Sequence, residues 1–248
     1  MNILVIPDSH ASPRVSMRRF DWLGRFIFDT KPDVVVELGD WADNDSMSGY
    51  DRGKASFEGR RYKKDVEAAH EARDIVNIYV ERMTKKPRLI ALKGNHEDRS
   101  DRFADLHPEM VGKVSSDDFR PDGWEYHDFL KNVNVGGITF SHYFGTGVLG
   151  RPVSGEHPAH KLLHTQLRSC VMGHTHIWDI CERTSGNRRI MCLVAGSYTD
   201  PRWTPSYAGP ARKLWYDGLT ILKDVANGYA PSVERVHISQ LEKAYNAR

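Results

Sequence analysis

Short apolar runs alternate with longer amphipathic segments over the first part of the chain. The runs at residues 2–8, 32–40 and 88–95 are rich in Val, Ile and Leu. Continuous runs of this kind are typical of strands that are covered on both faces. Between them, residues 12–30 and 61–86 place apolar side chains at roughly helical spacing. The order strand–helix–strand–helix–strand predicts parallel β-α-β units with right-handed crossovers.

The rest of the chain carries more strand-like runs than helical ones. Gly136–Gly137 divides one of these runs and predicts a hairpin, and a helix is expected over residues 159–166. No repeat, low-complexity tract or linker rich in Pro, Gly or Ser divides the sequence, so residues 1–248 are expected to form a single domain with two packed sheets. The further predicted strands cover residues 132–142, 167–184, 188–197, 218–225 and 232–241.

Polar residues of metal-binding type follow five successive apolar runs. In open α/β sheets the functional crevice lies outside the carboxyl ends of the strands. Any one of these residues could be an ordinary turn residue, since Asp and Asn are common in turns. Five in succession, four of them carrying histidine and the other a pair of acids, favour a site. The residues are Asp8 and His10, Asp40 and Asp43, Asn95 and His96, His142, and His174 and His176.

The residue types in this set suit transition metals. Asp8 and His10 are two positions apart, as are His174 and His176, and in extended backbone each pair would point to one face. Carboxylates, imidazoles and one amide suit Mn²⁺, Zn²⁺ or Fe better than Ca²⁺. Even seven ligands from this set of nine residues would exceed what one catalytic ion needs, and they would suffice for two ions that share a carboxylate. The H-x-H pair alone is equally compatible with a buried strand.

The ordered motifs resemble those of the calcineurin-like metallophosphoesterase superfamily. They are D-x-H at Asp8, G-D-x-x-D at Gly39, G-N-H-E at Gly94, the isolated His142, and G-H-x-H at Gly173. The resemblance implies an α/β fold in which two mixed β-sheets are sandwiched between helices, as four α-β-β-α layers. It also implies a metal-dependent phosphoesterase, a hydrolase of ester bonds that uses a metal-bridging hydroxide.

The resemblance further implies a role for each motif residue. The cofactor would be two divalent metal ions, with manganese favoured and zinc, iron, nickel or magnesium as alternatives. His96 would not bind metal but would donate a proton to the leaving oxygen, and Asp43 would orient His96. The first ion would be held by Asp8, His10 and His176, the second by Asn95, His142 and His174, and Asp40 would bridge the two.

One departure from the superfamily bears on the substrate. In its protein serine/threonine phosphatases an Arg-Gly pair follows G-D-x-x-D, whereas here Asn44 follows Asp43. The branch of phosphodiesterases, small phosphatases and DNA-repair nucleases is therefore the closer resemblance. A phosphodiester, nucleotide or nucleic-acid phosphate is the favoured substrate. The alternatives are a phosphomonoesterase, including a protein serine/threonine phosphatase, and a non-catalytic metal-binding interaction module.

Two segments that follow motif strands combine aromatic and cationic residues. They cover residues 41–64 and 197–216. Aromatic side chains stack on bases and cations contact phosphates, so these segments are candidates for nucleic-acid contact. An ordinary loop, with packed aromatics and solvated charges, is the competing interpretation. Arg60, Arg61 and Arg99 are the candidate substrate-binding residues.

Composition adds little to the substrate argument but bears on the compartment. A net charge of +2 does not by itself favour nucleic acid. The three cysteines, Cys170, Cys181 and Cys192, are too widely spaced for a thiolate zinc motif or a disulfide framework, which favours a reducing cytoplasm. No signal peptide or membrane-spanning run is visible, so no membrane partner is expected.

Three further histidines lie close together in the sequence. His160 and His164 would share one face of the helix predicted over residues 159–166, and His157 precedes it. No carboxylate partner is apparent. Surface or helix-packing roles are therefore favoured over a third metal site.

Overall fold

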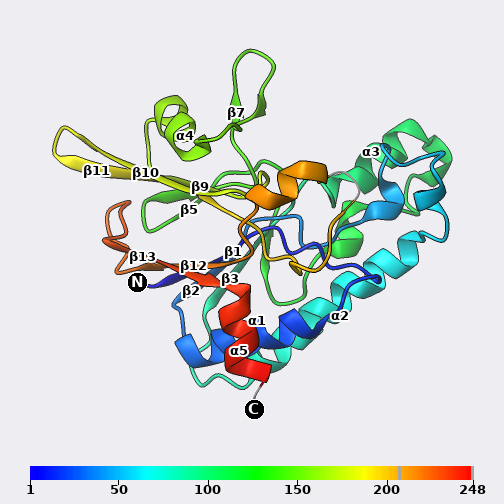
Figure 1. Cartoon of the computed structure of the whole chain (residues 1–248), viewed down its shortest axis with the longest axis horizontal. Helices are drawn as coiled ribbons and strands as arrows, with labels where there is room; N and C mark the ends of the chain where they lie inside the picture. The colour runs from blue at the N-terminus through cyan, green and yellow to red at the C-terminus, as the bar shows by residue number, and fades with distance from the viewer. Residues whose placement is uncertain (206–207, 247–248) are drawn as a thin grey trace.

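Two β-sheets lie face to face at the centre of the computed structural model, which describes residues 1–205 and 208–246 (Figure 1). The larger sheet has the order β13-β12-β1-β2-β3-β4. Its strands β1, β2, β3 and β4 are parallel, and at one edge β12 pairs antiparallel with β1 and β13 pairs antiparallel with β12. The strands are β1 (Ile3–Ile6), β2 (Val34–Glu37), β3 (Arg88–Leu92), β4 (Glu125–His127), β12 (Gly218–Lys223) and β13 (Ser232–His237).

The smaller sheet has the order β10-β11-β9-β6-β5, with β6 parallel to β9. The predicted hairpin is confirmed, since β5 and β6 pair antiparallel across Gly136–Gly137, and both glycines adopt positive φ. A separate two-stranded ribbon joins β7 and β8. The strands are β5 (Val133–Val135), β6 (Ile138–Phe140), β7 (Gly145–Thr146), β8 (Arg151–Pro152), β9 (Cys170–Met172), β10 (Trp178–Ser185) and β11 (Arg188–Ala195).

Helices cover the outer face of each sheet. Figure 1 shows α1, α2 and α5 on the side of the larger sheet, and α4 beyond the smaller one. α1 connects β1 to β2 and α2 connects β2 to β3, so the predicted parallel β-α-β order is confirmed. The helices are α1 (Arg18–Thr30), α2 (Tyr62–Glu81), α3 (Asp98–Leu106), α4 (Pro158–Gln166) and α5 (Ile238–Asn246).

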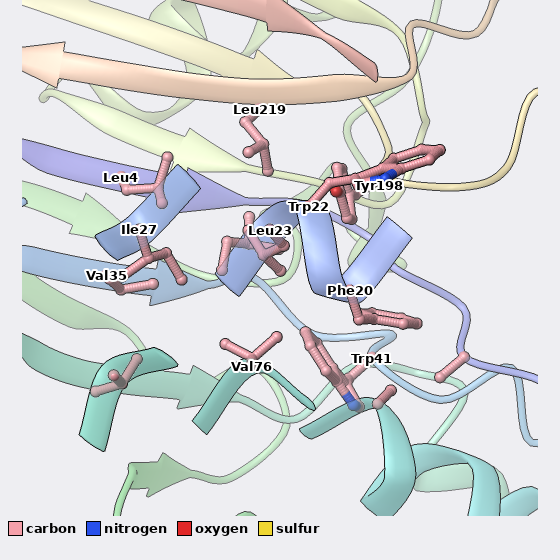
Figure 2. Packing of buried hydrophobic residues seen from close by; sticks show 14 of the residues in the cluster. Leu4, Phe20, Trp22, Leu23, Ile27, Val35, Trp41, Val76, Tyr198 and Leu219 are labelled. Atoms are coloured by element: carbon pink, nitrogen blue, oxygen red, sulfur yellow. The ribbon is translucent and has the colours of Figure 1, made fainter. Parts of the chain in front are cut away.

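The apolar runs explain the layers, because alternate residues of each strand enter different cores. In β1, Leu4 points to the helices, and Figure 2 shows it near Leu23 and Ile27 of α1. Its neighbours Ile3 and Val5 point instead to the core between the two sheets. A third core joins α4 to the outer face of the smaller sheet. The predicted fold of two mixed sheets between helices is therefore confirmed.

Three local predictions differ from the structure. The run at residues 167–184 forms two strands, β9 and β10, with the G-H-T-H motif in the connection between them. The run at residues 232–241 ends as a strand at His237 and continues as α5, which buries Ile238, Leu241 and Tyr245 at helical spacing. β4 was not predicted at all. Within the described ranges, no helix combines the length and the apolar character needed to cross a membrane.

Candidate metal centre

The connections after five strands meet at one end of the two sheets. Asp8 and His10 follow β1, and Asp40 follows β2. β3, β6 and β9 of the two sheets lead to the remaining motif residues. The motif side chains are largely buried, with Asp8, His10, Asp40, His142 and His176 each no more than 5% exposed. The strand ends that the sequence singled out therefore do converge.

Three overlapping groups of side chains have ligand atoms within 4.8 Å of one another. One group belongs to the predicted ligand set of the first ion, and another belongs to the predicted set of the second ion. The remaining group shares His10 with the former and Asp40 with the latter, and it adds His96. Asn95 joins the third group through its Oδ1 atom, 2.9 Å from Nε2 of His142. The groups are Asp8, His10 and His176; His10, Asp40 and His96; and Asp40, His142 and His174.

The backbone at this site is left-handed rather than extended. φ is 46° at His10, 54° at Asp40, 68° at His174 and 60° at His176. The expectation that two-residue spacing in extended chain points each pair to one face is therefore wrong. Tight turns bring these side chains together instead, with Thr175 N–H donating to Gly173 O. Left-handed non-glycine residues are costly and gather at functional sites.

Two motif glycines leave room for the carboxylates. A Cβ atom on Gly94 would overlap the Asp40 carboxylate, and one on Gly173 would overlap the Asp8 carboxylate. Each acid therefore packs directly against the backbone of another loop. The G-N-H-E and G-H-x-H motifs need glycine for this close approach.

Hydrogen bonds between the loops fix the orientation of the candidate ligands. The His142 Nδ1 atom lies 2.9 Å from Leu38 O, so the N–H of that nitrogen donates and Nε2 is left to face the centre. Asp8 Oδ1 accepts from the backbone N–H of His174 at 2.9 Å. Asp40 Oδ1 accepts from the backbone N–H of His96 at 2.8 Å. The loops of both sheets are thus tied together at the candidate ligands.

Glu97 is a site residue for which sequence reasoning assigned no role. Its carboxylate accepts from the backbone N–H groups of Asp40 at 3.1 Å, Ala42 at 2.8 Å and Gly94 at 2.9 Å. It therefore clamps the loop after β2 to the loop after β3. Its place in G-N-H-E was a signal of importance, but the pattern did not indicate this clamping contact.

The electrostatics favour ionised carboxylates at Asp8 and Asp40 and a neutral imidazole at His174. At His10 burial lowers the pKa, but the nearby carboxylates, Asp43 first, outweigh burial and raise it. Burial opposes ionisation of Asp8, but His176 and His142 together outweigh it and lower the pKa of the carboxyl. Burial likewise opposes ionisation of Asp40, and the surrounding histidines outweigh it and lower its pKa. For His174, burial and then His142 lower the pKa to about 4. For Asp8, Asp40 and His174 these are the protonation states that metal ligands require.

His96 lies at the edge of the centre between Asp43 and Arg99. Its Nδ1 atom is 2.7 Å from the backbone O of Asp43 and 3.3 Å from the Asp43 Oδ1 atom. Its Nε2 atom is 2.8 Å from the guanidinium of Arg99 and 3.7 Å from Oδ2 of Asp40. Burial and then the charge of Arg99 lower the pKa of His96 to about 4. The structure thus places Asp43 beside His96, as expected, and adds Arg99.

A cavity of about 230 Å³ opens beside Asp43 and Arg99, the two residues that flank His96. Its lining includes Asp43, Arg14, Arg60, Arg99 and Trp203. The Arg60 guanidinium is almost buried and forms ion pairs with Asp45 and Asp51. Arg61 is not brought to this cavity: its guanidinium donates to Arg60 O, and its side chain lines a separate hollow. Of the three candidate substrate-binding residues, two therefore line the cavity.

The aromatic side chains of residues 41–64 and 197–216 lie partly in the core and partly beside the candidate metal centre. Trp41 and Tyr198 are core residues, 3% and 0% exposed (Figure 2). Trp203 lies 6.2 Å from the His10 ring and Trp215 lies 4.0 Å from the His176 ring, between centroids. Positions 206 and 207 of the second segment lie outside the described residues.

The further histidines lie apart from this centre. His160 and His164 are on α4, with ring centroids 4.4 Å apart. Among the described residues, the groups that could hold a metal ion include neither of them, nor His157.

Comparison with known proteins gave one family and several distant structures. A family model described as calcineurin-like phosphoesterase matches residues 1–195. No curated protein sequence matches the chain. Yfce, a phosphoesterase from E. coli, is 17% identical over 96% of this chain and 100% of its own, with a TM-score of 0.40. The protein TT1561 of Thermus thermophilus is 10% identical over 96% and 98%, with a TM-score of 0.42. A predicted phosphoesterase from Streptococcus pneumoniae is 16% identical over 95% and 97%, with a TM-score of 0.32.

Proposed function

The chain belongs to the calcineurin-like phosphoesterase family and is thus a metal-dependent hydrolase, and we propose that it uses two metal ions to cleave phosphodiesters of nucleotides or nucleic acids. The cavity beside His96, where Arg99 and Trp203 lie, is the observation that carries the choice of substrate. Cationic and aromatic side chains together suit a phosphate that is attached to a base. The family membership by itself requires only a phosphoester.

The donor set supports two ions. The Nε2 atoms of His10 and His176 are 3.2 Å apart, as are Nε2 of His142 and Nδ1 of His174. Two nitrogens that each lie ~2.1 Å from one shared ion would be separated by about this distance. Bound divalent ions, with manganese favoured, would neutralise phosphate charge and lower the pKa of a water molecule. In our proposal Asp8, His10 and His176 hold the first ion, Asn95, His142 and His174 the second, and Asp40 bridges both.

His96 acts in this proposal as proton donor rather than as ligand. It belongs to a group with His10 and Asp40, so a ligand role is the geometric alternative. Arg99 supports the proton-donor role over that alternative, because its guanidinium already approaches Nε2 and would repel a metal cation there. A phosphate bound beside Arg99 would instead favour protonated His96, since an adjacent anion raises the pKa of an imidazole. His96 would then protonate the leaving oxygen.

Asn44 argues against a protein phosphatase. Its Nδ2 group donates to His96 O at 2.8 Å and to Ser100 Oγ at 3.0 Å, and the side chain is buried. It therefore supports the loop and offers no cation to a substrate phosphate. A phosphomonoesterase, including a protein serine/threonine phosphatase, remains the alternative activity.

The proposed compartment is the cytoplasm. Cys170 and Cys192 are buried and Cys181 is half-buried, and all three are free thiols in the structure. Free thiols persist in a reducing compartment, which supports this location.

Hydrolysis assays separate the two activities. With Mn²⁺ added, we expect faster turnover of bis-(p-nitrophenyl) phosphate than of p-nitrophenyl phosphate. Faster turnover of the monoester would favour the phosphomonoesterase. No turnover of either, with bound metal shown by elemental analysis, would favour the non-catalytic interaction module.

The role of His96 can be tested by substitution. We expect His96→Ala to lose ~10²- to 10⁴-fold in kcat, the usual contribution of a general acid, while two ions per chain remain bound. Metal content and turnover are measured on the same preparation. His160→Ala, at an exposed position of α4, is the matched control and should leave both unchanged. A fall in metal content of the His96 variant would identify His96 as a ligand.

A further inference from the structure

A second hollow adjoins the cavity beside His96. It has a volume of about 390 Å³, within the range of small-ligand sites. Arg99 lines both hollows, so the two meet at the residue that contacts His96. The remaining lining includes Tyr50, Arg52, Arg102, Phe103 and Leu106.

Helix α3 supplies one wall of this second hollow. Arg99, Arg102, Phe103 and Leu106 are spaced three or four residues apart and therefore share one helical face. Tyr50 and Arg52, from the connection between β2 and α2, supply the opposite wall. Figure 1 shows α3 beside this connection. The wall begins at Arg99, which follows the G-N-H-E motif and contacts His96.

The lining is apolar and cationic. The side chains of Tyr50 and Leu106 are 85% and 78% exposed, which is unusual for large apolar residues at neighbouring positions. The Arg52 guanidinium lies 4.8 Å above the Phe103 ring, and among the ion pairs of residues 1–205 and 208–246 it has no carboxylate. Arg102 is paired with Asp98 at 3.1 Å. Among the described residues, only Arg102 of the three arginines in this lining has a carboxylate partner, so the surface carries excess positive charge. It therefore complements an anion that carries a flat apolar group.

We propose that this second hollow binds a nucleoside of the phosphodiester substrate, while Arg99 holds the scissile phosphate beside His96. The exposed ring of Tyr50 would stack on the base, and Arg52 and Arg102 would contact a neighbouring phosphate. A phosphoester that carries no nucleoside would leave this surface unused. The inference rests on the proposed phosphodiesterase activity for its catalytic consequence, but binding of the nucleoside does not require turnover.

Kinetics with matched substrates test the catalytic consequence. The Mn²⁺-loaded full chain is assayed with thymidine 5′-(p-nitrophenyl phosphate) and with methyl p-nitrophenyl phosphate, which lacks a nucleoside. We expect Tyr50→Ala to raise KM for the nucleoside ester about tenfold, as loss of one stacking contact does, and to leave the methyl ester unaffected. Tyr50→Phe, which keeps the ring, should retain the wild-type KM. Arg183→Ala, exposed on β10, is the control.

The result that would overturn the inference is an equal change on both substrates, or no change on either. Binding is tested separately by ultraviolet crosslinking of a 5-bromodeoxyuridine dinucleotide to the chain in EDTA, with the crosslinked peptide identified by mass spectrometry. We expect peptides that contain Tyr50 or Phe103. Crosslinks confined to peptides with Trp203 or Trp215 would overturn the inference even if diesters are hydrolysed. Crosslinks at Tyr50 without hydrolysis of any diester would overturn the proposed function and leave the inference standing.

Discussion

Asp43 lies between two imidazoles of the candidate metal centre. Its Oδ1 atom is 3.3 Å from Nδ1 of His10 and 3.3 Å from Nδ1 of His96. Burial opposes ionisation of Asp43, but the two imidazoles outweigh it and hold the pKa of the carboxyl below its usual range. A charged carboxylate at this point would orient a proposed metal ligand on one side and the proposed proton donor on the other.

Asp43→Asn should therefore weaken both metal binding and turnover. We expect a fall of ~10- to 100-fold in affinity for the first ion and a similar fall in kcat, the usual cost of losing a residue that orients a ligand. Metal titration and steady-state kinetics measure the two effects. His96→Ala, which should affect turnover alone, provides the comparison. Wild-type metal affinity in the Asp43 variant would show that Asp43 does not support His10.

At the scale of elements, the sequence predicted those strands whose two faces are both buried by neighbouring layers. β1, β2 and β3 are continuous apolar runs because each is covered by helices on one face and by the second sheet on the other. β4 spans three residues and is exposed or half-buried, so it has no apolar run to reveal it. The apolar spacing of α5 is helical, but it directly continues the strand pattern of β13.

The site could be predicted in position but not in conformation. Parallel strands place their carboxyl ends together, which is why motif residues far apart in sequence meet. The left-handed turns at His10, Asp40 and His174 depend on contacts between loops, such as the one from His174 N–H to Asp8 Oδ1. Spacing along one segment cannot reveal such contacts.

The segment between β2 and α2 offers a matched pair of adjacent arginines. Arg60 lines the cavity beside His96. Arg61 is exposed and lies in the lining of a neighbouring hollow, to which Arg60 also contributes. We expect Arg60→Gln to reduce cleavage of DNA about tenfold more than cleavage of bis-(p-nitrophenyl) phosphate, since loss of one charge contact costs ~1–2 kcal/mol. Arg61→Gln should have a smaller effect on DNA. Rates on both substrates at equal Mn²⁺ measure the difference.

Stability must be measured alongside, because Arg60 also holds Asp45 and Asp51. Equal loss on both substrates, together with a lower midpoint of urea unfolding, would mean that Arg60 acts structurally. A larger effect of Arg61 than of Arg60 on DNA would contradict the placement of the substrate in the cavity.

At the scale of the whole molecule, the proposed ions would join the two sheets. Asp8, Asp40 and Asn95 follow strands of the larger sheet, and His142 and His174 follow strands of the smaller one. Ions that bind only the folded chain stabilise it in proportion to the logarithm of their concentration. Each proposed ion takes ligands from both sheets, so release of metal would remove a link across the core between them.

Metal should therefore raise the unfolding temperature. At a Mn²⁺ concentration ~100 times the dissociation constant, each ion is expected to add ~2.7 kcal/mol to the free energy of unfolding relative to the protein in EDTA. Thermal unfolding over a Mn²⁺ titration measures this. His142→Ala should lower the slope of the dependence, and an exposed control, His160→Ala, should not. An unfolding temperature independent of Mn²⁺ would contradict the proposed metal centre.

A buried acid–base pair lies behind the centre, in the larger sheet and α2. Glu37 Oε2 is 3.4 Å from the Arg73 guanidinium, which in turn packs against the rings of Trp41 and Trp124. Burial raises the pKa of Glu37 to about 8, although Arg73 opposes the shift. Glu37 is therefore expected to be uncharged at neutral pH, with Oε1 accepting from Gly39 N–H.

This pKa predicts how stability depends on pH. Between 4.5, the ordinary value, and about 8, unfolded Glu37 is ionised while folded Glu37 keeps its proton, so its contribution to stability falls as pH rises. Glu37→Gln removes this pH-dependent contribution, because glutamine does not titrate. In EDTA, we compare the free energies of unfolding of the variant and the wild type at each pH. The variant's value minus the wild-type value should increase between pH 4.5 and about 8 and stay level at higher pH. Urea unfolding over a pH series measures the difference. A loss of ~3–5 kcal/mol in the variant at neutral pH would contradict the prediction, because it would show an ionised Glu37 paired with Arg73.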